Sequence, residues 1–210
     1  MHAAVKACRE PGEEARLGSA QIDVGHADLG KSKLVRPAVN LSQQRATIQD
    51  LSIDPHPPIL GSRSVHWRDE AACAATARVL AGRPALRDAI VELRGPLGAG
   101  KTSFVRHLLH ALGVQGHVKS PTYAVMEPYE LPGGDVWHFD FFRFDDPQEW
   151  QDAGFRDVYA SRGLKIAEWP EKAAGLLPAP DLSVAIAIGD DDSRAASFLA
   201  HTARGLELLP

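Results

Sequence analysis

The sequence predicts an α/β fold in which a mixed β-sheet carries flanking helices. An apolar run at residues 89–94 has the composition of a strand buried on both faces, and it leads directly into a glycine-rich segment at 95–102. Apolar side chains then recur at helical spacing over residues 103–112. A strand, a tight loop and a helix that are followed by further strands indicate a sheet with helices packed against it.

The other elements follow from apolar periodicity and turn residues. Upstream of the apolar run, the pattern predicts a strand at 64–67 and a helix at 69–81 that ends before Gly82. Gly113 ends the helix after the loop, and Pro132-Gly133-Gly134 predicts a hairpin turn. The downstream elements are strands at 123–131, 136–144, 164–168, 182–188 and 195–203, and a short helix at 147–153.

Aromatic residues divide the chain sharply. All four Trp, three Tyr and seven Phe lie at or after Trp67, whereas residues 1–62 hold seven basic residues, seven acidic residues and five prolines. Such a segment buries too little apolar surface to offset its ordering entropy. We therefore expect a disordered extension at 1–62 and a folded domain at 63–207. A start codon placed too far upstream would explain the same composition.

Charge, cysteine content and hydropathy narrow the classes of protein. The net charge of -4 argues against a broad positive surface, so any contact with RNA would be local or made through a partner. Cys8 and Cys73 lack metal-site spacing, and Cys73 stands among alanines as a core residue does. No run approaches the roughly 20 apolar residues of a membrane span, and residues 1–20 carry charges where a signal peptide is apolar. These features predict a cytoplasmic protein.

The glycine-rich segment matches the phosphate-loop pattern G-x-x-x-x-G-K-[ST] in the context that this pattern requires, after a buried strand and before an amphipathic helix. Its glycines allow successive backbone N–H groups to turn toward phosphate oxygens. Lys101 would meet the β- and γ-phosphates, and the Thr102 hydroxyl would hold magnesium. The sequence thus predicts a P-loop NTPase-like fold that binds ATP and Mg2+. The predicted loop contacts are Gly95, Gly98, Ala99, Gly100, Lys101, Thr102 and Ser103.

A second match to the same pattern, at residues 25–32, serves as a comparison. It lacks the middle glycine, places Asp28 where the anion would lie, and meets Pro37 where a helix should continue. We therefore expect no phosphate binding at Lys31.

Two carboxylates occupy strand positions among apolar residues, where a charged group requires a partner or a function. Asp140 shares a strand face with His138 and would either orient magnesium or water, or form an ion pair with Arg143. His138 by itself is typical of a hydrogen-bonded core residue. Glu168 ends an apolar strand at the edge where parallel sheets bind ligands, and it would either reach magnesium or be a solvated strand end.

The tripeptide Ser120-Pro121-Thr122 follows a glycine-containing segment at 113–119. Thr122 would then respond to a γ-phosphate as switch residues do. The same tripeptide is equally typical of a simple turn. The residues alone leave both interpretations open.

Four motifs occur in a particular order and spacing: Gly95 to Thr102, Ser120-Pro121-Thr122, His138-x-Asp140-x-Phe142-Arg143 and Glu168-Trp169-Pro170-Glu171. Together they resemble the TsaE family, small bacterial ATPases needed to make threonylcarbamoyladenosine in transfer RNA. The resemblance covers about residues 64 to 205. Four linked motifs are more specific than any one of them.

The resemblance implies an ATPase that is weak alone and acts on the TsaD and TsaB complex, so that tRNA is contacted only indirectly. It implies that Thr102 and Glu168 hold magnesium, while Asp140 serves hydrolysis or the switch that accompanies it. The expected catalytic residues are Lys101, Asp140 and Glu168. Trp169 would lie near the nucleotide or the moving region. Arg194, in the last hairpin, would touch the base.

Two positions depart from the family pattern. The family commonly has an acidic residue where Pro96 stands, and commonly tyrosine at Phe142, so any contact made by that hydroxyl is missing here. The long N-terminal segment is also outside the pattern. None of these departures involves Lys101, Thr102 or Glu168.

Two other functions fit the same loop. One is a small-molecule kinase, although the sequence shows no lid of clustered arginines. The other is a non-hydrolysing module in which ATP binding orders a surface for a partner.

Overall fold

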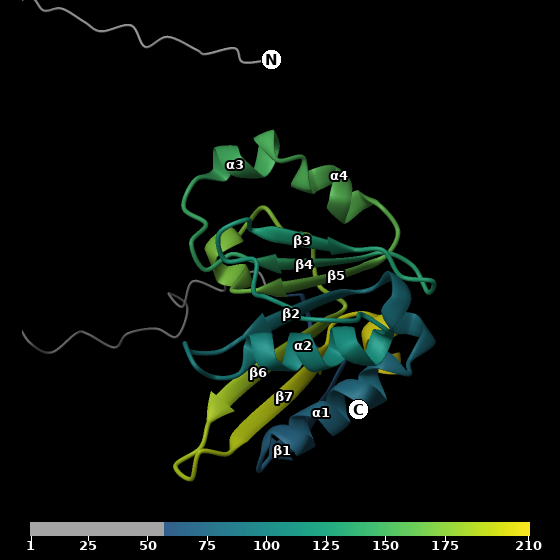
Figure 1. The fold of residues 1–210 in the computed structure, drawn as a ribbon, viewed down its shortest axis with the longest axis vertical. Helices are drawn as coiled ribbons and strands as arrows, with labels where there is room; N and C mark the ends of the chain where they lie inside the picture. The colour runs from purple at the N-terminus through teal and green to yellow at the C-terminus, as the bar shows by residue number, and fades with distance from the viewer. Residues whose placement is uncertain (1–56) are drawn as a thin grey trace, which may run out of the picture. The chain divides into compact units, whose positions relative to one another are not determined.

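The computed structural model describes residues 57–210, so most of the predicted extension and the whole second loop match, 25–32, lie outside the described residues. The described chain forms a seven-stranded mixed sheet in the order β1-β7-β6-β2-β5-β4-β3 (Figure 1). Its strands are β1 (Gly61–Trp67), β2 (Ile90–Arg94), β3 (Met126–Tyr129), β4 (Val136–Asp140), β5 (Leu164–Glu168), β6 (Leu182–Ile188) and β7 (Arg194–Ala200). Its helices are α1 (Glu70–Ala81), α2 (Lys101–Leu112), α3 (Pro147–Asp152), α4 (Phe155–Ala160) and α5 (Ala203–Glu207), with 3-10 turns η2 (Pro84–Asp88) and η3 (Pro170–Ala173).

The centre of the sheet is parallel and its edges are antiparallel. Strands β6, β2, β5 and β4 run side by side in one direction, whereas β7 and β1 close one edge and β3 the other. In this register Glu168 stands between Leu93 on β2 and Asp140 on β4. The parallel arrangement therefore brings the carboxyl ends of β2, β5 and β4 together. Two carboxylate side chains, Glu168 and Asp140, lie at these strand ends.

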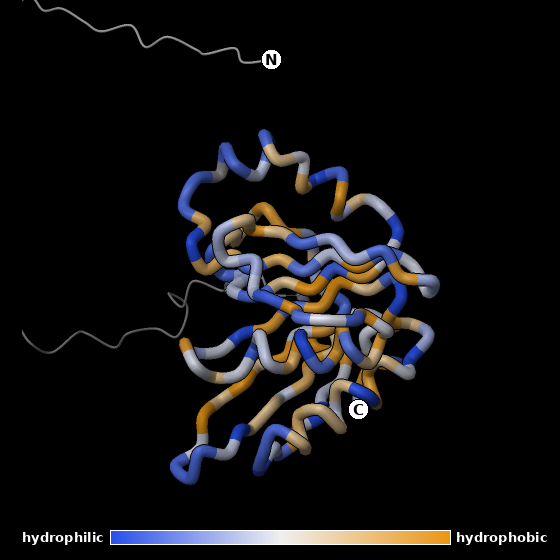
Figure 2. Tube along the Cα trace, in the orientation of Figure 1, coloured by the Kyte–Doolittle hydropathy of each residue, from blue (hydrophilic) through white to orange (hydrophobic). Residues whose placement is uncertain are grey.

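Helices α1 and α2 pack on one face of the sheet. Helix α2 buries Phe104, Leu108 and Leu109, and the Phe104 ring stacks on Trp67 at 5.3 Å between centroids. Figure 2 shows hydrophobic residues concentrated along the central strands beneath these helices. This packing fixes the first turn of α2, which begins at Lys101, over the carboxyl ends of β2 and β5.

The opposite face carries an aromatic cluster made by β4, α3 and α4. Phe139 meets Tyr159 at 5.0 Å and Phe155 at 5.4 Å between ring centroids, and Trp150 joins them. Alternation along β4 therefore sends Phe139 to this cluster and sends His138 and Asp140 to the α2 face.

The structure confirms the mixed α/β class and the strands at 164–168 and 182–188, and it corrects several boundaries. The extended segments predicted at 123–131 and 136–144 shrink to β3 and β4, because Val125 has φ 63° and because the chain turns after Asp140. The N–H of Phe141 donates to the Glu168 carbonyl, and that of Phe144 donates to the Phe141 carbonyl, which ends the strand.

Shorter elements at the chain's later part were not predicted. The last strand ends at Ala200 rather than 203, because Thr202 caps the short helix α5 through a bond from the Gly205 N–H. Helix α4 was also missed. At the other end, β1 begins at Gly61, three residues before the predicted start of the strand.

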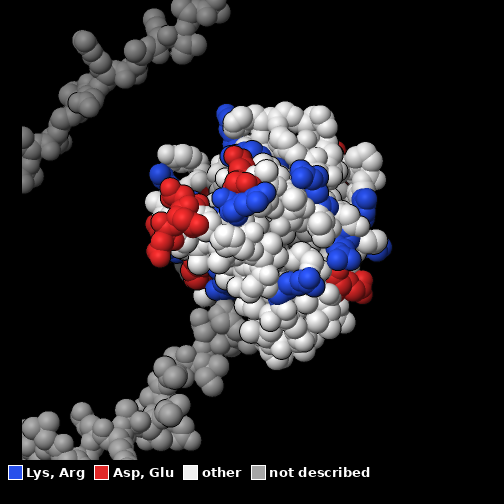
Figure 3. Space-filling view, turned by 90° about the horizontal axis from the view of Figure 1, so that it is seen from below, with Lys and Arg blue, Asp and Glu red and all other residues white. Residues whose placement is uncertain are grey.

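Surface and core properties match the composition. Cys73 is buried, as predicted, and burial raises the pKa of its thiol to about 12. On the face drawn in Figure 3, basic and acidic side chains are interspersed in small groups. Among residues 57–210, no helix is both long and apolar enough to cross a membrane.

Candidate phosphate-binding site

The loop between β2 and α2 adopts a backbone conformation that favours glycine at three positions. Gly95, Gly98 and Gly100 have φ of 139°, 79° and 100°, a region disfavoured for other residues. A Cβ on Gly95 would lie 2.3 Å from the Ile186 carbonyl oxygen, so this glycine lets the loop pass close to β6. A Cβ on Gly98 or Gly100 would meet nothing within 4 Å. The loop is therefore tight against the sheet and open on its outer side.

Helix α2 presents its N-terminus to that open side. The Phe104 N–H makes the bond to the Gly100 carbonyl at 2.9 Å, so the N–H groups of residues 101–103 precede the helical ladder. The Ala99 N–H instead donates to the Pro96 carbonyl at 3.2 Å, which closes the loop on itself. Free N–H groups and the positive end of the helix dipole together favour an anion at this position.

Lys101 lies inside the loop. Its Nζ donates to the carbonyl oxygens of Gly95 at 2.7 Å and Pro96 at 3.0 Å, and it stands 3.7 Å from the centroid of the Trp169 ring. Burial lowers the pKa of this ammonium, and the charge of Glu168 is the largest effect that opposes the shift. The loop carbonyls thus hold the Lys101 ammonium at a position where it could donate to a phosphate oxygen.

Trp169 owes its position to an unusual backbone conformation. It follows Glu168 with φ 56°, in the left-handed region, and η3 starts directly after it. Its N–H donates to the Leu93 carbonyl at 3.3 Å, and its ring meets that of Phe142 at 5.1 Å. The turn directs the indole back over Lys101 rather than along the strand.

Glu168 is buried and connects two strands to α2. It is only 1% exposed, which excludes the solvated strand end that the sequence left open. The Thr102 hydroxyl donates to its Oε2 at 2.8 Å, and His138 Nε2 lies 2.9 Å from its Oε1. The two residues predicted as magnesium ligands are therefore direct neighbours.

Asp140 has hydroxyl and backbone partners instead of the alternative ion pair. Its Oδ2 accepts from Ser120 Oγ and, at 2.6 Å, from Thr122 Oγ1, while its Oδ1 accepts from the Phe142 N–H at 3.0 Å. Arg143 points elsewhere and stacks over the Tyr123 ring at 4.4 Å. Asp140 thus ties the Ser-Pro-Thr segment to β4, and one open pocket is lined by Thr102, Ser120, Thr122, Asp140 and Glu168.

Comparison with known proteins agrees with this geometry. The family model "Threonylcarbamoyl adenosine biosynthesis protein TsaE" matches residues 67–196, more than half of the chain. The chain belongs to the TsaE family. That family takes part in threonylcarbamoyladenosine biosynthesis for tRNA.

Individual TsaE relatives and one solved structure are similar over the same domain. The TsaE protein of Haemophilus influenzae is 41% identical over 120 residues, which cover 57% of this chain and 75% of the relative. The Bacillus subtilis TsaE protein is 32% identical, over 53% of this chain and 69% of its own length. The crystal structure of Bacillus subtilis YdiB has the same fold, with a TM-score of 0.56 and 24% identity over 70% of this chain and 91% of that one.

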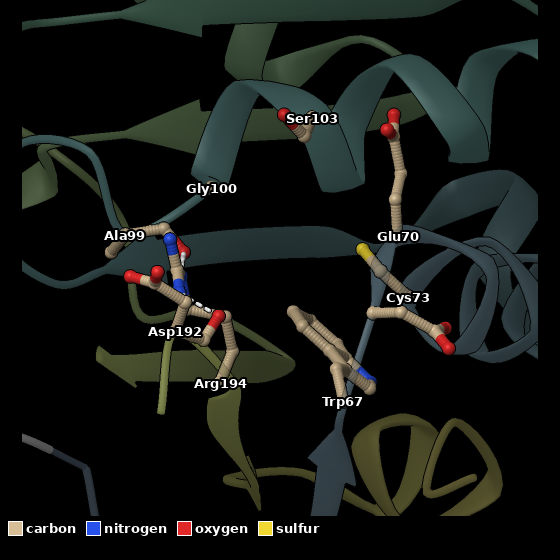
Figure 4. A pocket seen from close by; sticks show the side chains of 9 residues that line it. Trp67, Glu70, Cys73, Ala99, Gly100, Ser103, Asp192 and Arg194 are labelled. Carbon is tan, nitrogen blue, oxygen red and sulfur yellow. Dashed lines mark hydrogen bonds between the residues drawn. The ribbon is translucent and has the colours of Figure 1, made fainter. Parts of the chain in front are cut away.

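A second pocket of this TsaE chain shares Gly100 and Ser103 with the phosphate pocket (Figure 4). Arg194 reaches into it from β7 and donates through Nε to the Ala99 carbonyl at 3.1 Å and through Nη2 to the Gly98 carbonyl at 3.4 Å. The pocket is lined by Trp67, Asp69, Glu70, Cys73, Ala99, Gly100, Ser103, Asp192 and Arg194. The predicted Arg194 and Ser103 therefore share one pocket, next to the loop.

Sequence reasoning about this TsaE chain assigned no site role to His138 or Ser120. Both touch predicted acids, His138 at Glu168 and Ser120 at Asp140. The available signal was spacing: His138 precedes Asp140 by two residues on a strand and must share its face. Which neighbouring strand it would meet was not visible in the sequence.

Proposed function

We propose that this protein binds ATP with magnesium and hydrolyses it in the cytoplasm, slowly alone and faster with the TsaD and TsaB transferase complex. The activity would serve threonylcarbamoyladenosine formation without this chain modifying tRNA itself. The observation that carries the proposal is the contact of Thr102 with Glu168 beside a glycine loop that already encloses the Lys101 ammonium.

The loop fits a triphosphate in shape and charge. Its outer side is open at Gly98 and Gly100, and the first N–H groups of α2 point to it. Lys101 now satisfies its charge with two loop carbonyls, and phosphate oxygens are stronger acceptors for the same ammonium. Arg194 and Ser103 would line the path of the base and sugar in the second pocket.

The residues present also fit a magnesium ion. Residues 57–210 contain no cluster of three His, Cys, Asp or Glu side chains suited to a metal, so this part of the chain offers few metal ligands of its own. Magnesium at nucleotide sites uses one or two protein oxygens and takes the rest from phosphates and water. Thr102 and Glu168 supply two oxygens, and the ion would neutralise charge on the transferred phosphate.

Asp140 would act through the segment that it holds. Its two oxygens already accept three hydrogen bonds, so it is poorly placed as a free general base. It can instead keep the hydroxyls of Ser120 and Thr122 beside the phosphate pocket, where a γ-phosphate would compete for them. This arrangement supports a switch that responds to the nucleotide.

The mouth of the pocket supports the proposed partner dependence. Leu97 is 74% exposed and Phe142 36%, and both line the phosphate pocket; Tyr123, which follows the pocket residue Thr122 in the chain, is 84% exposed. Exposed apolar side chains around a polar site are typical of a surface that another protein covers. A covering partner would exclude water from the phosphates and complete the site.

The test is ATP turnover with and without purified TsaD and TsaB, for the wild type and for Lys101→Ala, Asp140→Ala and Glu168→Ala. We expect stimulation by the partners that all three substitutions abolish. Unchanged turnover in Glu168→Ala would remove that residue from the site. A phosphorylated small product would indicate a kinase, and ATP-dependent partner binding without phosphate release would indicate a regulatory module.

A further inference from the structure

His138 is the one imidazole among the described residues that contacts the predicted magnesium ligands. It sits in the middle of β4, is fully buried, and pairs in register with Ile166 on β5. Its Nε2 lies 2.9 Å from Glu168 Oε1. Because a buried polar ring needs a hydrogen-bond partner and this ring has a single polar contact, the contact with Glu168 indicates the role of His138.

The polar surroundings of the His138 ring favour one of its tautomers. An ionised carboxylate only accepts, so Nε2 must carry the hydrogen that points to Glu168. Nδ1 is buried and has no hydrogen-bond partner among the described residues. The tautomer with hydrogen on Nε2 leaves only a lone pair at Nδ1, which costs less than an unpaired N–H there. The ring therefore delivers one donor in one direction.

That donor separates the roles of the two Glu168 oxygens. Oε1 is occupied by His138, whereas Oε2 faces α2 and accepts from Thr102 at 2.8 Å. Without His138, Oε1 would be buried without a donor, and the carboxylate would gain by rotating toward another one. We propose that His138 is a positioning residue that holds Glu168 Oε2 toward the magnesium site, an inference that rests on the proposed function.

The test separates magnesium binding from nucleotide binding. Calorimetry would measure the Kd of a non-hydrolysable ATP analogue in excess magnesium and again in EDTA, for the wild type, His138→Leu, His138→Gln and His138→Asn. Glutamine can place its amide donor near the position of Nε2, whereas asparagine is too short and leucine has no donor. Ile166→Val, its neighbour on β5, controls for general loosening of the same core.

We expect His138→Leu and His138→Asn to weaken binding in magnesium by about 10- to 100-fold, the usual effect of losing a residue that orients a metal ligand. Binding in EDTA should stay within about threefold of the wild type, as should His138→Gln and Ile166→Val in either condition. If leucine prevents folding, asparagine against glutamine gives the same comparison.

Two results would overturn the inference. Equal losses with and without magnesium would mean that His138 only supports the core. Unchanged affinity in magnesium for both His138→Leu and His138→Asn would mean that His138 does not orient Glu168. Failure of the proposed ATP binding, on which the inference rests, looks different, because the wild type would then bind no nucleotide in either condition.

Discussion

Two buried glutamates on neighbouring strands differ in what surrounds them. Glu92 on β2 is 4% exposed and Glu168 on β5 is 1% exposed, so burial does not distinguish them. Arg94 Nη2 lies 2.9 Å from Glu92 Oε2, whereas Glu168 is held by a hydroxyl and an imidazole. A guanidinium neutralises its carboxylate, while hydroxyl donors leave the charge available to a cation. The side chains that contact each glutamate, rather than its burial, therefore distinguish the candidate functional acid from the structural one.

The two acids also lie on opposite faces of the sheet. Glu92 points to the aromatic face, where its charge adds to burial in raising the pKa of Tyr159 well above the usual range. Glu168 points to α2 and lines the phosphate pocket. The glycine loop lies on the same face as Glu168, so Glu168 and not Glu92 can contact a phosphate or magnesium ion bound at that loop.

The largest effect should come from Glu168→Gln. This change keeps the size of the side chain but removes the charge that would hold magnesium, and we expect partner-stimulated turnover to fall by about 100-fold or more. Phosphate release with the partners present measures it. Activity within a few-fold of wild type would mean that the acid is as structural as Glu92.

A smaller loss is expected from Asp140→Asn. The amide removes the charge that accepts from Ser120, Thr122 and the Phe142 N–H, and a nitrogen in place of Oδ2 would require both hydroxyls to turn around and accept instead. We expect turnover to fall by about tenfold or more while the Kd for the nucleotide changes little. Thr122→Ala should lower turnover in the same direction. A change in Kd alone would contradict the switch role.

Glu92→Gln should affect folding instead of chemistry. It leaves Arg94 without its carboxylate, and we expect the free energy of unfolding to fall by about 1–3 kcal/mol. Denaturant unfolding measures this, with turnover at a permissive temperature as the control. If Glu92→Gln lost as much turnover as Glu168→Gln at unchanged stability, the two acids would not differ in function as proposed.

The smallest effect is expected at the second loop match. Lys31→Ala should leave the Kd for magnesium-ATP unchanged, because Asp28 and the missing glycine make residues 25–32 a poor anion site. Lys101→Ala, measured beside it by calorimetry, should lose binding. Equal losses of affinity in Lys31→Ala and Lys101→Ala would show that the sequence around the loop pattern does not predict which match binds phosphate.

Local signals explain which parts of the fold were predictable. Strand β5, strand β6 and helix α2 have strong periodicity or punctuating glycines, and each was predicted close to its observed bounds. Helices α4 and α5 have six and five residues, too few for a helical pattern to emerge, whereas α3, which is also six residues long, has a proline at its start that signals a helix. Strand β3 starts after the positive φ of Val125, and β4 ends where the Phe141 N–H bonds to the Glu168 carbonyl, a contact with a strand that is distant in the sequence.

By itself, the sequence determined the phosphate loop, its helix and the two candidate acids, because glycine spacing and strand ends act within a few residues. Only the tertiary structure decided the partners of those acids: His138 and Thr102 at Glu168, and Ser120 and Thr122 at Asp140. The physical reason is that parallel strands distant in the chain share an edge, and their register sets which side chains meet.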